Sequence, residues 1–379
     1  MMGAVSMQRR IYTSGGIFAL LLLIGIVMPG SFAIQQPGPA LDVTGSIDDV
    51  PLVDISGAET YDSDTHYFMT TVSQQGNPDG GAIGGQAFAA LLDPQQQLIP
   101  IRAIYSRTDT SEEIDSRNAA MMTNSQDTGT VAALEAAGLT VPMTLTVTGV
   151  VEGSPNAGVF EPGDVIKTVT DPVGDDKAPR DVVSFSALTS LLATLPAGTE
   201  LTIGVERDGK SLDLNATTMD NETDSTGWTP PGSRLGIGLA PSDIQFPVDV
   251  TYGIENIGGP SAGSMFALEI YDRLTPGSLG GDNLIAGTGT MSLNGEIGPI
   301  GGIAHKLVGA SRQGAEYFLA PATNCAETVG HEPAGMQVFA VRNIKESIAA
   351  TEAIAAGDTS GLTTCKAVAD AAPKQESAG

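Results

Sequence analysis

The chain has 379 residues, of which 41% are apolar, and a formal net charge of −26 at pH 7. This length and composition predict a globular protein with roughly two or three domains and a buried core. The negative charge argues against binding to nucleic acid or to an anionic lipid surface, because both carry charge of the same sign. We interpret the acidity itself as an aid to solubility.

The N-terminus carries the pattern of an exported or anchored protein. Arg9 and Arg10 precede a stretch without charge, from Ile11 to Ile34, which contains the dense apolar run IFALLLLIGIVM. Arginines in front of an apolar run keep the N-terminus in the cytoplasm and send the following residues across the membrane. Both fates of this stretch, cleavage or retention, place the domains after about residue 40 outside the cytoplasm.

Two interpretations of this stretch stay open. The dense run has about the length of a signal peptide, and SFA at 31–33 resembles a small-residue cleavage site. The whole uncharged stretch also reaches the ~20 residues of a membrane-spanning helix. We therefore expect a cytoplasmic segment at 1–10, a transmembrane anchor or signal peptide at 11–34, and a single-pass location in the cell membrane with the catalytic part extracytoplasmic.

Residues 35–135 form the least informative region, which we expect to be a separate N-terminal extracytoplasmic segment. HYFMTTVSQQ predicts a strand, because it is rich in Thr, Val and aromatic residues. GGQAFAALLD and SRNAAMMTNSQDTGTVAALEAAG predict helices, the second ending at Gly138. We interpret Met121 and Met122 as core residues and find no chemistry here.

Residues 136–220 contain a clearer order of elements. MTLTVTGVVEGSPN and AGVFEPGDVIKTV predict strands joined by a turn, FSALTSLLATLP predicts a helix, and two alternating strands flank Asp208-Gly209, a hairpin signal. This order, with EGSPNAGVFEPGDVI at its centre, resembles a PDZ domain of the bacterial protease type. The resemblance implies a domain that binds peptide C-termini by adding them as a strand to a sheet edge. A domain kept for packing or regulation is the alternative.

The hairpin contains a misleading motif. Gly204 to Ser211 fits the phosphate-loop pattern G-x-x-x-x-G-K-[ST], but such a loop needs a helix after it, and the following LDLNATT alternates like a strand. We therefore predict no nucleotide binding. Residues 221–234 are polar and rich in Pro and Gly, which predicts a linker.

From residue 235 onward strands and helices alternate. FPVDVTYG, NLIAGTGTMSL, EIGPIGG, YFLAP and MQVFAV predict strands, whereas SAGSMFALEIYDRL, IAHKLVGASRQG and IKESIAATEAIAAG predict helices. This predicts a domain at 235–365 with a mixed sheet, of α+β or α/β class, followed by a flexible tail at 366–379.

Ser261 lies in the sequence GGPSAG, which fits the G-x-S-x-G pattern of many catalytic serines. Pro260 suits the first position of a helix, so Ser261 lies where free backbone N–H groups gather. The N–H groups of Gly259, Ser261 and Ala262 are therefore candidates to stabilise an oxyanion. The alternative is a serine that only caps the helix, which is the commoner use of this position.

A catalytic serine needs a base. In an α/β-hydrolase, an acid and then a histidine follow the serine, and Asp282 with His305 or His331 supplies that order. That fold also needs many strands and helices before the nucleophile, and only residues 235–261 are left for them. The hydrolase interpretation therefore fits poorly.

The stretches GGPSAGSMFALEIYD and AGTGTMSLNGEIGPIGGIAHKLVGASRQGAEYFLAP resemble the proteolytic domain of Lon proteases. In that pattern a PSAG serine and a TG turn precede P-I-G-G, and a lysine follows the last glycine by four residues. The resemblance implies that Ser261 is the nucleophile and Lys306 the base, and that Thr288 contacts the lysine. The chain differs from Lon by a preceding PDZ-like region, by the lack of an ATPase domain, and by Gly258, where many Lon enzymes carry an acidic residue. Together these features resemble the PDZ-bearing, ATPase-free Lon-like proteases of bacterial envelopes.

A lysine base must be shifted from its ordinary pKa near 10.4 toward 7–8, which requires burial worth about 4 kcal/mol. Lys306 has the apolar neighbours Ile303 and Leu307, which suits such burial. The alternative for Lys306 is an exposed helix lysine. His305 should face another side of the helix, and we interpret it as structural.

Two cysteines, Cys325 and Cys365, lie 40 positions apart in the part expected to be exported. Disulfides persist in such compartments, so a bridge is expected, with two buried thiols as the alternative. Its loop would make it worth roughly 3–4 kcal/mol.

The sequence therefore predicts an ATP-independent serine endopeptidase with a Ser–Lys dyad, which cleaves exported or membrane-associated polypeptides recruited by the PDZ domain. We expect no cofactor, metal, nucleotide or nucleic acid. We expect contact with the membrane through the N-terminal helix, and we leave homo-oligomerisation open. The alternatives are a non-catalytic PDZ scaffold with a degenerate protease fold, and a G-x-S-x-G esterase.

Overall fold

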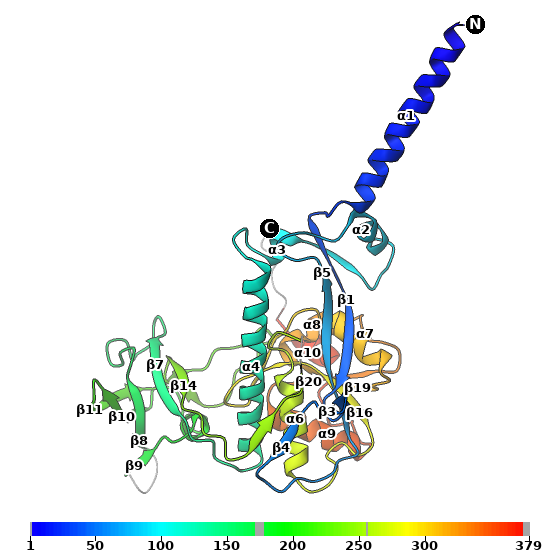
Figure 1. The fold of residues 1–379 in the computed structure, drawn as a ribbon. Coiled ribbons are helices and arrows are strands. Elements are labelled where there is room, and N and C mark those ends of the chain that lie inside the picture. Colours follow the sequence, from blue (N-terminus) through cyan, green and yellow to red (C-terminus); the bar gives the residue numbers. More distant parts are fainter. Residues whose placement is uncertain (1, 171–177, 255–256, 374–379) are drawn as a thin grey trace.

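The computed structural model describes residues 2–170, 178–254 and 257–373, with side chains from residue 12 onward (Figure 1). Two six-stranded sheets dominate the described part of the chain. The long helix α4 (Ser111–Ala136) runs between the two sheet-containing halves (Figure 1). The mixed α/β architecture expected from the sequence is confirmed.

The first sheet has the strand order β20-β19-β16-β5-β1-β6. Its strands are β1 (Phe32–Asp42), β5 (His66–Gln75), β6 (Gln97–Pro100), β16 (Leu284–Gly287), β19 (Tyr317–Pro321) and β20 (Gln337–Val341). Strands β20, β19, β16 and β5 run parallel to one another, and β1 pairs antiparallel with both β5 and β6. The sheet is therefore mixed, as predicted.

This sheet takes strands from both ends of the chain. Strands β1, β5 and β6 precede residue 135, and β16, β19 and β20 follow residue 280. The sequence had suggested a separate segment at 35–135 and a catalytic domain that begins at 235. The structure instead joins the two regions in one sheet, in which Tyr67 of β5 pairs with Ile285 of β16. This pairing was not predicted because contacts between distant strands leave no local sequence signal.

The second sheet has the order β11-β10-β8-β7-β14, with β9 paired to β8. Its strands are β7 (Thr144–Val150), β8 (Val165–Thr170), β9 (Pro179–Asp181), β10 (Glu200–Arg207), β11 (Lys210–Thr217) and β14 (Ile237–Ser242), and helix α5 (Phe185–Leu192) precedes β10. The expected linker ends in the short strand β13 (Ser233–Arg234), which pairs with β12 (Met219–Asp220) just before the linker. Beyond that linker, β14 returns to the second sheet.

The second sheet is inserted into the first domain. The chain leaves at Pro142 and returns at Gln245, and the N–H of Gln245 donates to the carbonyl of Pro142 at 2.8 Å. We call residues 143–244 the inserted unit. Its expected phosphate-loop-like motif forms the hairpin of β10 and β11, with Asp208 and Gly209 at positive φ. These residues therefore do not form the strand-loop-helix arrangement of a nucleotide site.

Helix α4 contributes to two hydrophobic cores. Ala132 and Ala133 pack in the core of the first domain, and Val131 and Leu134 pack in the core of the inserted unit. A capping box fixes the start of the helix, since Thr110 accepts from the backbone of Glu113. Both halves of the molecule therefore hold this helix.

The remaining short elements complete the two domains. The strands are β2 (Ser46–Ile47), β3 (Val50–Pro51), β4 (Asp54–Ser56), β15 (Asp249–Thr251), β17 (Thr290–Met291) and β18 (Ile297–Gly298). The helices are α2 (Gly84–Ala90), α3 (Ile101–Ile104), α6 (Gly263–Leu274), α7 (Ile303–Arg312), α8 (Cys325–Thr328), α9 (Ile344–Ala355) and α10 (Cys365–Ala371), with a 3-10 turn at Ala322–Asn324.

The C-terminal helix is tied to the first domain. Cys325 and Cys365, at the starts of α8 and α10, form a disulfide and are fully buried. A flexible tail was expected at 366–379, but its first residues belong to helix α10, which ends at Ala371. Residues 374–379 lie outside the described part.

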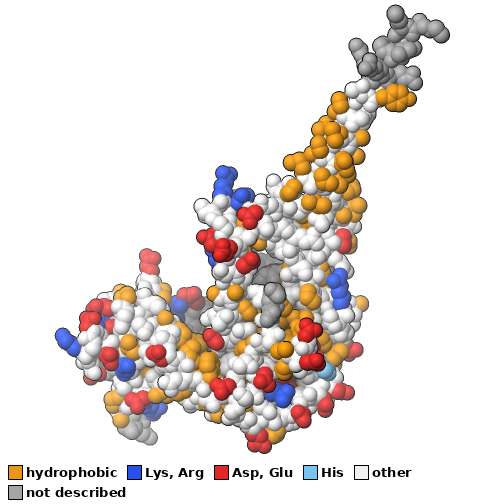
Figure 2. Space-filling view, in the orientation of Figure 1, with side chains coloured by type: hydrophobic (Ala, Val, Ile, Leu, Met, Phe, Trp, Pro, Cys, Tyr) orange, Lys and Arg blue, Asp and Glu red, His pale blue; other side chains and the backbone are white. Residues whose placement is uncertain are grey.

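The N-terminal helix α1 (Met2–Val27) is where the structure contradicts the sequence analysis. Among the described residues, no helix is both long and apolar enough to cross a membrane. The helix ends at Val27 and β1 begins at Phe32, so the uncharged part of the helix is shorter than the ~20 residues of a span. The expected transmembrane anchor is wrong, and so is the single-pass membrane location inferred from it. Figure 2 shows that apolar side chains are exposed along α1.

Candidate active site

Ser261 lies in the turn that leads into α6. The helix begins at Gly263, with Ala262 as the cap residue and no side-chain capping bond, two residues later than the sequence suggested. The hydroxyl of Ser261 therefore does not cap the helix. Instead, Ser261 Oγ accepts a hydrogen bond of 2.7 Å from Lys306 Nζ.

Lys306 reaches the serine from the first turn of α7. Gly302, at φ 70°, lets the chain turn into this helix in a conformation that favours glycine. Lys306 then falls on the same helix face as Ile303 and Leu307, which pack against the sheet, and its side chain is buried with them. Gly309 permits this close packing, because a Cβ there would lie 2.7 Å from the carbonyl oxygen of Gly38 on β1.

Thr288 joins the serine and the lysine. Its Oγ1 accepts from Lys306 Nζ at 2.8 Å and donates to the carbonyl of Ser261 at 3.0 Å. The residue is 1% exposed and follows directly after β16. The structure therefore brings together all three side chains that the sequence had singled out.

Burial controls the protonation of Lys306. The residue is 3% exposed, and this desolvation lowers the pKa of its amine from 10.5 to about 7. Both of its hydrogen-bond partners in the described structure are uncharged hydroxyls. A substantial fraction of the amine is therefore neutral near neutral pH, as a general base requires.

The three candidate oxyanion donors are not equivalent. The N–H of Gly259 donates to the carbonyl of Asn118 on α4 at 3.0 Å, so this donor is already used. No acceptor among the described residues takes the N–H of Ser261 or of Ala262. Of the three candidates, these two are the donors left free in the described structure next to Ser261 Oγ.

The residues of the hydrolase interpretation do not meet at Ser261. His305 is half-buried, and its pKa is lowered by burial and, to a smaller extent, by electrostatic repulsion from His331. Asp282 is exposed. No hydrogen bond within the described structure joins any of these three side chains to the serine.

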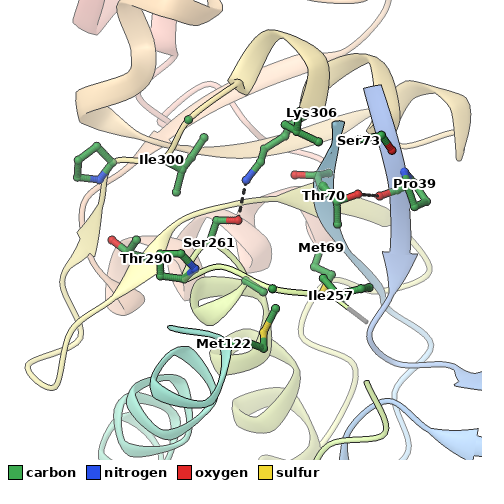
Figure 3. Close-up of a pocket in the computed structure, with 17 residues that line it drawn as sticks. Pro39, Met69, Thr70, Ser73, Met122, Ile257, Ser261, Thr290, Ile300 and Lys306 are labelled. Atoms are coloured by element: carbon green, nitrogen blue, oxygen red, sulfur yellow. Dashed lines mark hydrogen bonds between the residues drawn. The ribbon is translucent and has the colours of Figure 1, made fainter. Parts of the chain in front are cut away.

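A cavity of about 720 Å³ opens at Ser261 and Lys306 (Figure 3). Its apolar lining consists of Pro39, Met69, Val72, Met122, Ile257, Pro260, Ala262, Pro299 and Ile300. Its polar lining includes Thr70, Thr71, Ser73 and Thr290, and Lys306 is the one charged side chain among the described lining residues. The described part of the chain has no cluster of His, Cys, Asp and Glu that could hold a metal ion.

Sequence reasoning missed the contribution of residues before 135 to this cavity. Thr70 comes from β5 and Met122 from α4, both in the region where no chemistry was expected. The clue was weak: a buried strand pattern and a methionine pair, each of which also fits an ordinary core.

Comparison with known proteins agrees with this geometry. Residues 242–351 match the model of the Lon protease (S16) C-terminal proteolytic domain. Lon protease 2 of Bacillus subtilis (strain 168) is 34% identical over 110 residues, which are 29% of this chain and 19% of that protein. The peroxisomal Lon protease homolog 2 of Caenorhabditis elegans is 37% identical over 100 residues, 26% of this chain and 12% of that protein.

Residues 242–351 are therefore similar to Lon protease C-terminal proteolytic domains, which confirms the resemblance to that domain predicted from the sequence. The chain spans about a fifth or less of the length of these relatives. Among solved structures, the PDZ domain of an SdrC-like protein from Listeria monocytogenes matches 25% of this chain and 85% of that domain, at 19% identity and a TM-score of 0.20. A TM-score this low carries no argument about the inserted unit.

Proposed function

We propose that this chain is a serine endopeptidase that works without ATP, with Ser261 as nucleophile and Lys306 as general base. The observation that carries the proposal is the 2.7 Å bond between Lys306 Nζ and Ser261 Oγ, made by an amine whose pKa burial lowers to about 7. A serine hydroxyl becomes an effective nucleophile when such a base takes its proton.

The reaction follows from this pair. Neutral Lys306 accepts the proton of Ser261 while Oγ attacks the carbonyl carbon of the scissile peptide bond. The resulting ammonium then gives that proton to the leaving amine, and an acyl-serine remains. Lys306 next takes a proton from the water that attacks the ester, and then gives this proton to Ser261 Oγ as the acid product leaves. This restores the serine hydroxyl and the neutral amine. Thr288 holds the amine in line throughout, because it accepts from Nζ and is itself tied to the backbone of Ser261.

The cavity supports a polypeptide substrate in an extended conformation. Strand β16 pairs with β5 from His66 to Met69, and beyond Met69 no described strand lies on that side of β5. Thr70 to Ser73 line the cavity there. We propose that a loose segment of substrate lies along this edge, with an apolar side chain in the cavity.

The proposal of ATP independence rests on the fold around the site. The phosphate-loop-like sequence from Gly204 to Ser211 forms a hairpin, so it supplies no helix N-terminus for phosphates. Because we propose a reaction that uses no ATP-driven unfolding, the substrates we propose are loosely folded polypeptides. The disulfide between Cys325 and Cys365 is of a kind that persists in oxidising compartments, which favours exported proteins among them.

We also propose that the inserted unit is a PDZ domain that collects substrate. Strand β14 pairs with β7 and lies at the edge of the second sheet among the described strands. An exposed edge can take a peptide as an added strand. Strand β14 ends at Ser242, and fewer than twenty residues connect it to Ser261. A peptide bound along β14 would therefore be held by a strand that a short segment joins to the proposed nucleophile.

Cleavage of an unfolded protein without nucleotide tests the proposed reaction. The intact chain should digest it, Ser261→Ala should not, and a serine-reactive phosphonate should modify Ser261 in the intact chain. A wild-type protein that leaves both an unfolded protein and short peptides uncut would favour the degenerate scaffold. Hydrolysis of simple esters with no cleavage of peptide bonds would favour the esterase.

Excision of the inserted unit tests its role. Because Pro142 and Gln245 are hydrogen-bonded, residues 143–244 can be replaced by a short Gly-Ser linker that leaves the ends in contact. Cleavage of short peptides should continue, and cleavage of whole proteins should fall. Equal loss of both activities in a folded variant would mean that the unit is structural.

A further inference from the structure

We infer that Ser125 of α4 is a positioning residue for the oxyanion donor at Ser261, an inference that rests on the proposed function of Ser261. Ser125 Oγ donates a hydrogen bond of 3.1 Å to the carbonyl oxygen of Pro260. The residue is 2% exposed and lies outside the segment that matches the proteolytic domain family. Its hydroxyl reaches across to another element rather than back to its own helix.

The bond fixes one peptide unit next to the nucleophile. The carbonyl of Pro260 and the N–H of Ser261 belong to the same peptide plane, and no peptide in the described chain is cis. In a trans peptide these two groups point in opposite directions. A carbonyl held toward Ser125 therefore directs the N–H of Ser261 away from Ser125, and no described acceptor takes that N–H.

The helix crossing allows this bond. Helices α4 and α6 meet with glycine on both sides: a Cβ on Gly129 would lie 2.9 Å from the carbonyl oxygen of Gly263. A Cβ on Gly263 would lie 2.9 Å from Ser125 Oγ. Glycine at these two positions lets the helices approach closely enough for the serine hydroxyl to reach Pro260.

Neighbouring peptide units are held by other groups. The backbone carbonyl of Asn118, about two turns before Ser125 on α4, accepts from the N–H of Gly259 at 3.0 Å. The carbonyl of Ser261 accepts from Thr288 Oγ1 and from the N–H of Gly289, both at 3.0 Å. Ser125 supplies the anchor between these two points. Because α4 is packed into two cores, this anchor is fixed before substrate arrives.

The inference predicts a selective loss of turnover. Removal of a direct oxyanion donor costs roughly 10²–10³-fold in kcat, and loss of a group that only orients the donor should cost less, about tenfold. Ser125→Ala in the full chain should therefore lower kcat for a peptide about tenfold and leave KM within about twofold. The inhibition constant of a peptide boronate, whose adduct places an oxygen in the same position, should rise in parallel.

Two further variants separate positioning from stability. Ser125→Cys keeps a weak donor and should have an intermediate kcat. Thr128→Val removes another buried hydroxyl of α4, which bonds only to carbonyls of its own helix in the described structure. This variant should have a Tm comparable to that of Ser125→Ala but keep the wild-type kcat. The apparent pKa of the rate profile should stay unchanged in Ser125→Ala, because the base is not touched.

The outcomes distinguish this inference from the proposed function. Four results would each overturn the role of Ser125. In Ser125→Ala these are an unchanged kcat, a change in KM without a change in kcat, or a shifted apparent pKa. The fourth is a fall of kcat in Thr128→Val equal to that in Ser125→Ala. Full activity of Ser261→Ala would instead overturn the proposed nucleophile, whatever Ser125 does.

Discussion

Lys306 Nζ lies 2.7 Å from Ser261 Oγ, in a position where the lysine side chain is almost fully removed from water. A carboxylate beside the amine would favour its charged form and raise its pKa. The described surroundings offer hydroxyl groups and apolar side chains instead, so desolvation dominates and the pKa falls to about 7. The pair therefore combines a hydrogen bond to the serine with an amine whose pKa lies in the range that a general base needs.

Replacement of Lys306 should abolish activity as completely as replacement of Ser261. Lys306→Ala removes the base, and Lys306→Arg keeps a cation that does not deprotonate. We expect kcat/KM for a peptide to fall about 10³-fold or more in both, with no further loss when Ser261→Ala is added, because the two residues act as one unit. His305→Ala is the control and should retain most activity. An active Lys306→Ala beside an inactive histidine variant would restore the hydrolase interpretation.

Thr288 should matter through its hydroxyl. Thr288→Val keeps the shape of the side chain but removes both the acceptor for Lys306 and the donor to the carbonyl of Ser261. We expect kcat to fall about tenfold to a hundredfold, in the range of a disturbed proton transfer. Thr288→Ser retains the hydroxyl and should recover most of the rate. Steady-state kinetics of the two variants will show whether the hydroxyl or the packing is responsible.

Glu269 should make stability depend on pH. The residue is 1% exposed on α6, and its Oε2 has no hydrogen-bond partner in the described structure. Burial raises its pKa from 4.5 to about 8, the neighbouring Arg273 opposes this rise, and Asp272 and Asp42 add to it. The folded state therefore holds a proton that the unfolded state releases between these two values. This contribution to stability is present below pH 4.5 and is lost as the pH rises through about 8.

The matched variant for this prediction is Glu269→Gln, which is neutral at every pH. Its free energy of unfolding should be close to that of the wild type at pH 5 and should exceed it by a few kcal/mol at pH 9. Urea unfolding at pH 5, 7 and 9 measures the difference. A difference that stays constant over this range would show that Glu269 is not protonated in the folded state.

The disulfide should stabilise the first domain against unfolding. Cys325 and Cys365 are fully buried and close a loop between residues 40 positions apart. Replacement of both by alanine should lower the free energy of unfolding by roughly 3–4 kcal/mol. Reductant should lower the unfolding midpoint of the wild type but leave that of the double variant unchanged. A reductant effect on both proteins would assign it to something other than the disulfide.

The sequence singled out Lys306 as the partner of Ser261 because the determinants of its position are local. Pro299 to Gly302 specify a turn with a glycine at positive φ, and the helix period then places Lys306 on the buried face. The strand from His66 to Gln75 was also predicted with its observed bounds, since its apolar and β-branched residues carry a strong local signal.

The contacts between distant segments could not be read in this way. The bond from Gly259 to Asn118 removes a candidate oxyanion donor, and the bond from Ser125 to Pro260 orients another. Both depend on how α4 crosses α6, for which sequence spacing gives no measure. The same holds for β14, which returns to the second sheet beyond a segment whose Pro and Gly content indicated only a linker.

The prediction of a transmembrane anchor failed for a different physical reason. Absence of charge from Ile11 to Ile34 was taken as the length of one span, but secondary structure changes within it. The helix ends at Val27, and Phe32 to Ile34 enter a strand whose residues Ala33 and Ile34 are buried in the first domain. Hydropathy alone does not show where a helix stops.

The most direct measurement of the dyad is the pH dependence of kcat for a short peptide. The active form of Lys306 is the neutral amine, so the rate should rise with pH through an apparent pKa near 7 and reach a plateau above it. His305→Ala and His331→Ala should show the same rising limb. A limb near the pKa of a free lysine, or a limb near 7 that disappears in a histidine variant, would contradict the Ser261–Lys306 dyad.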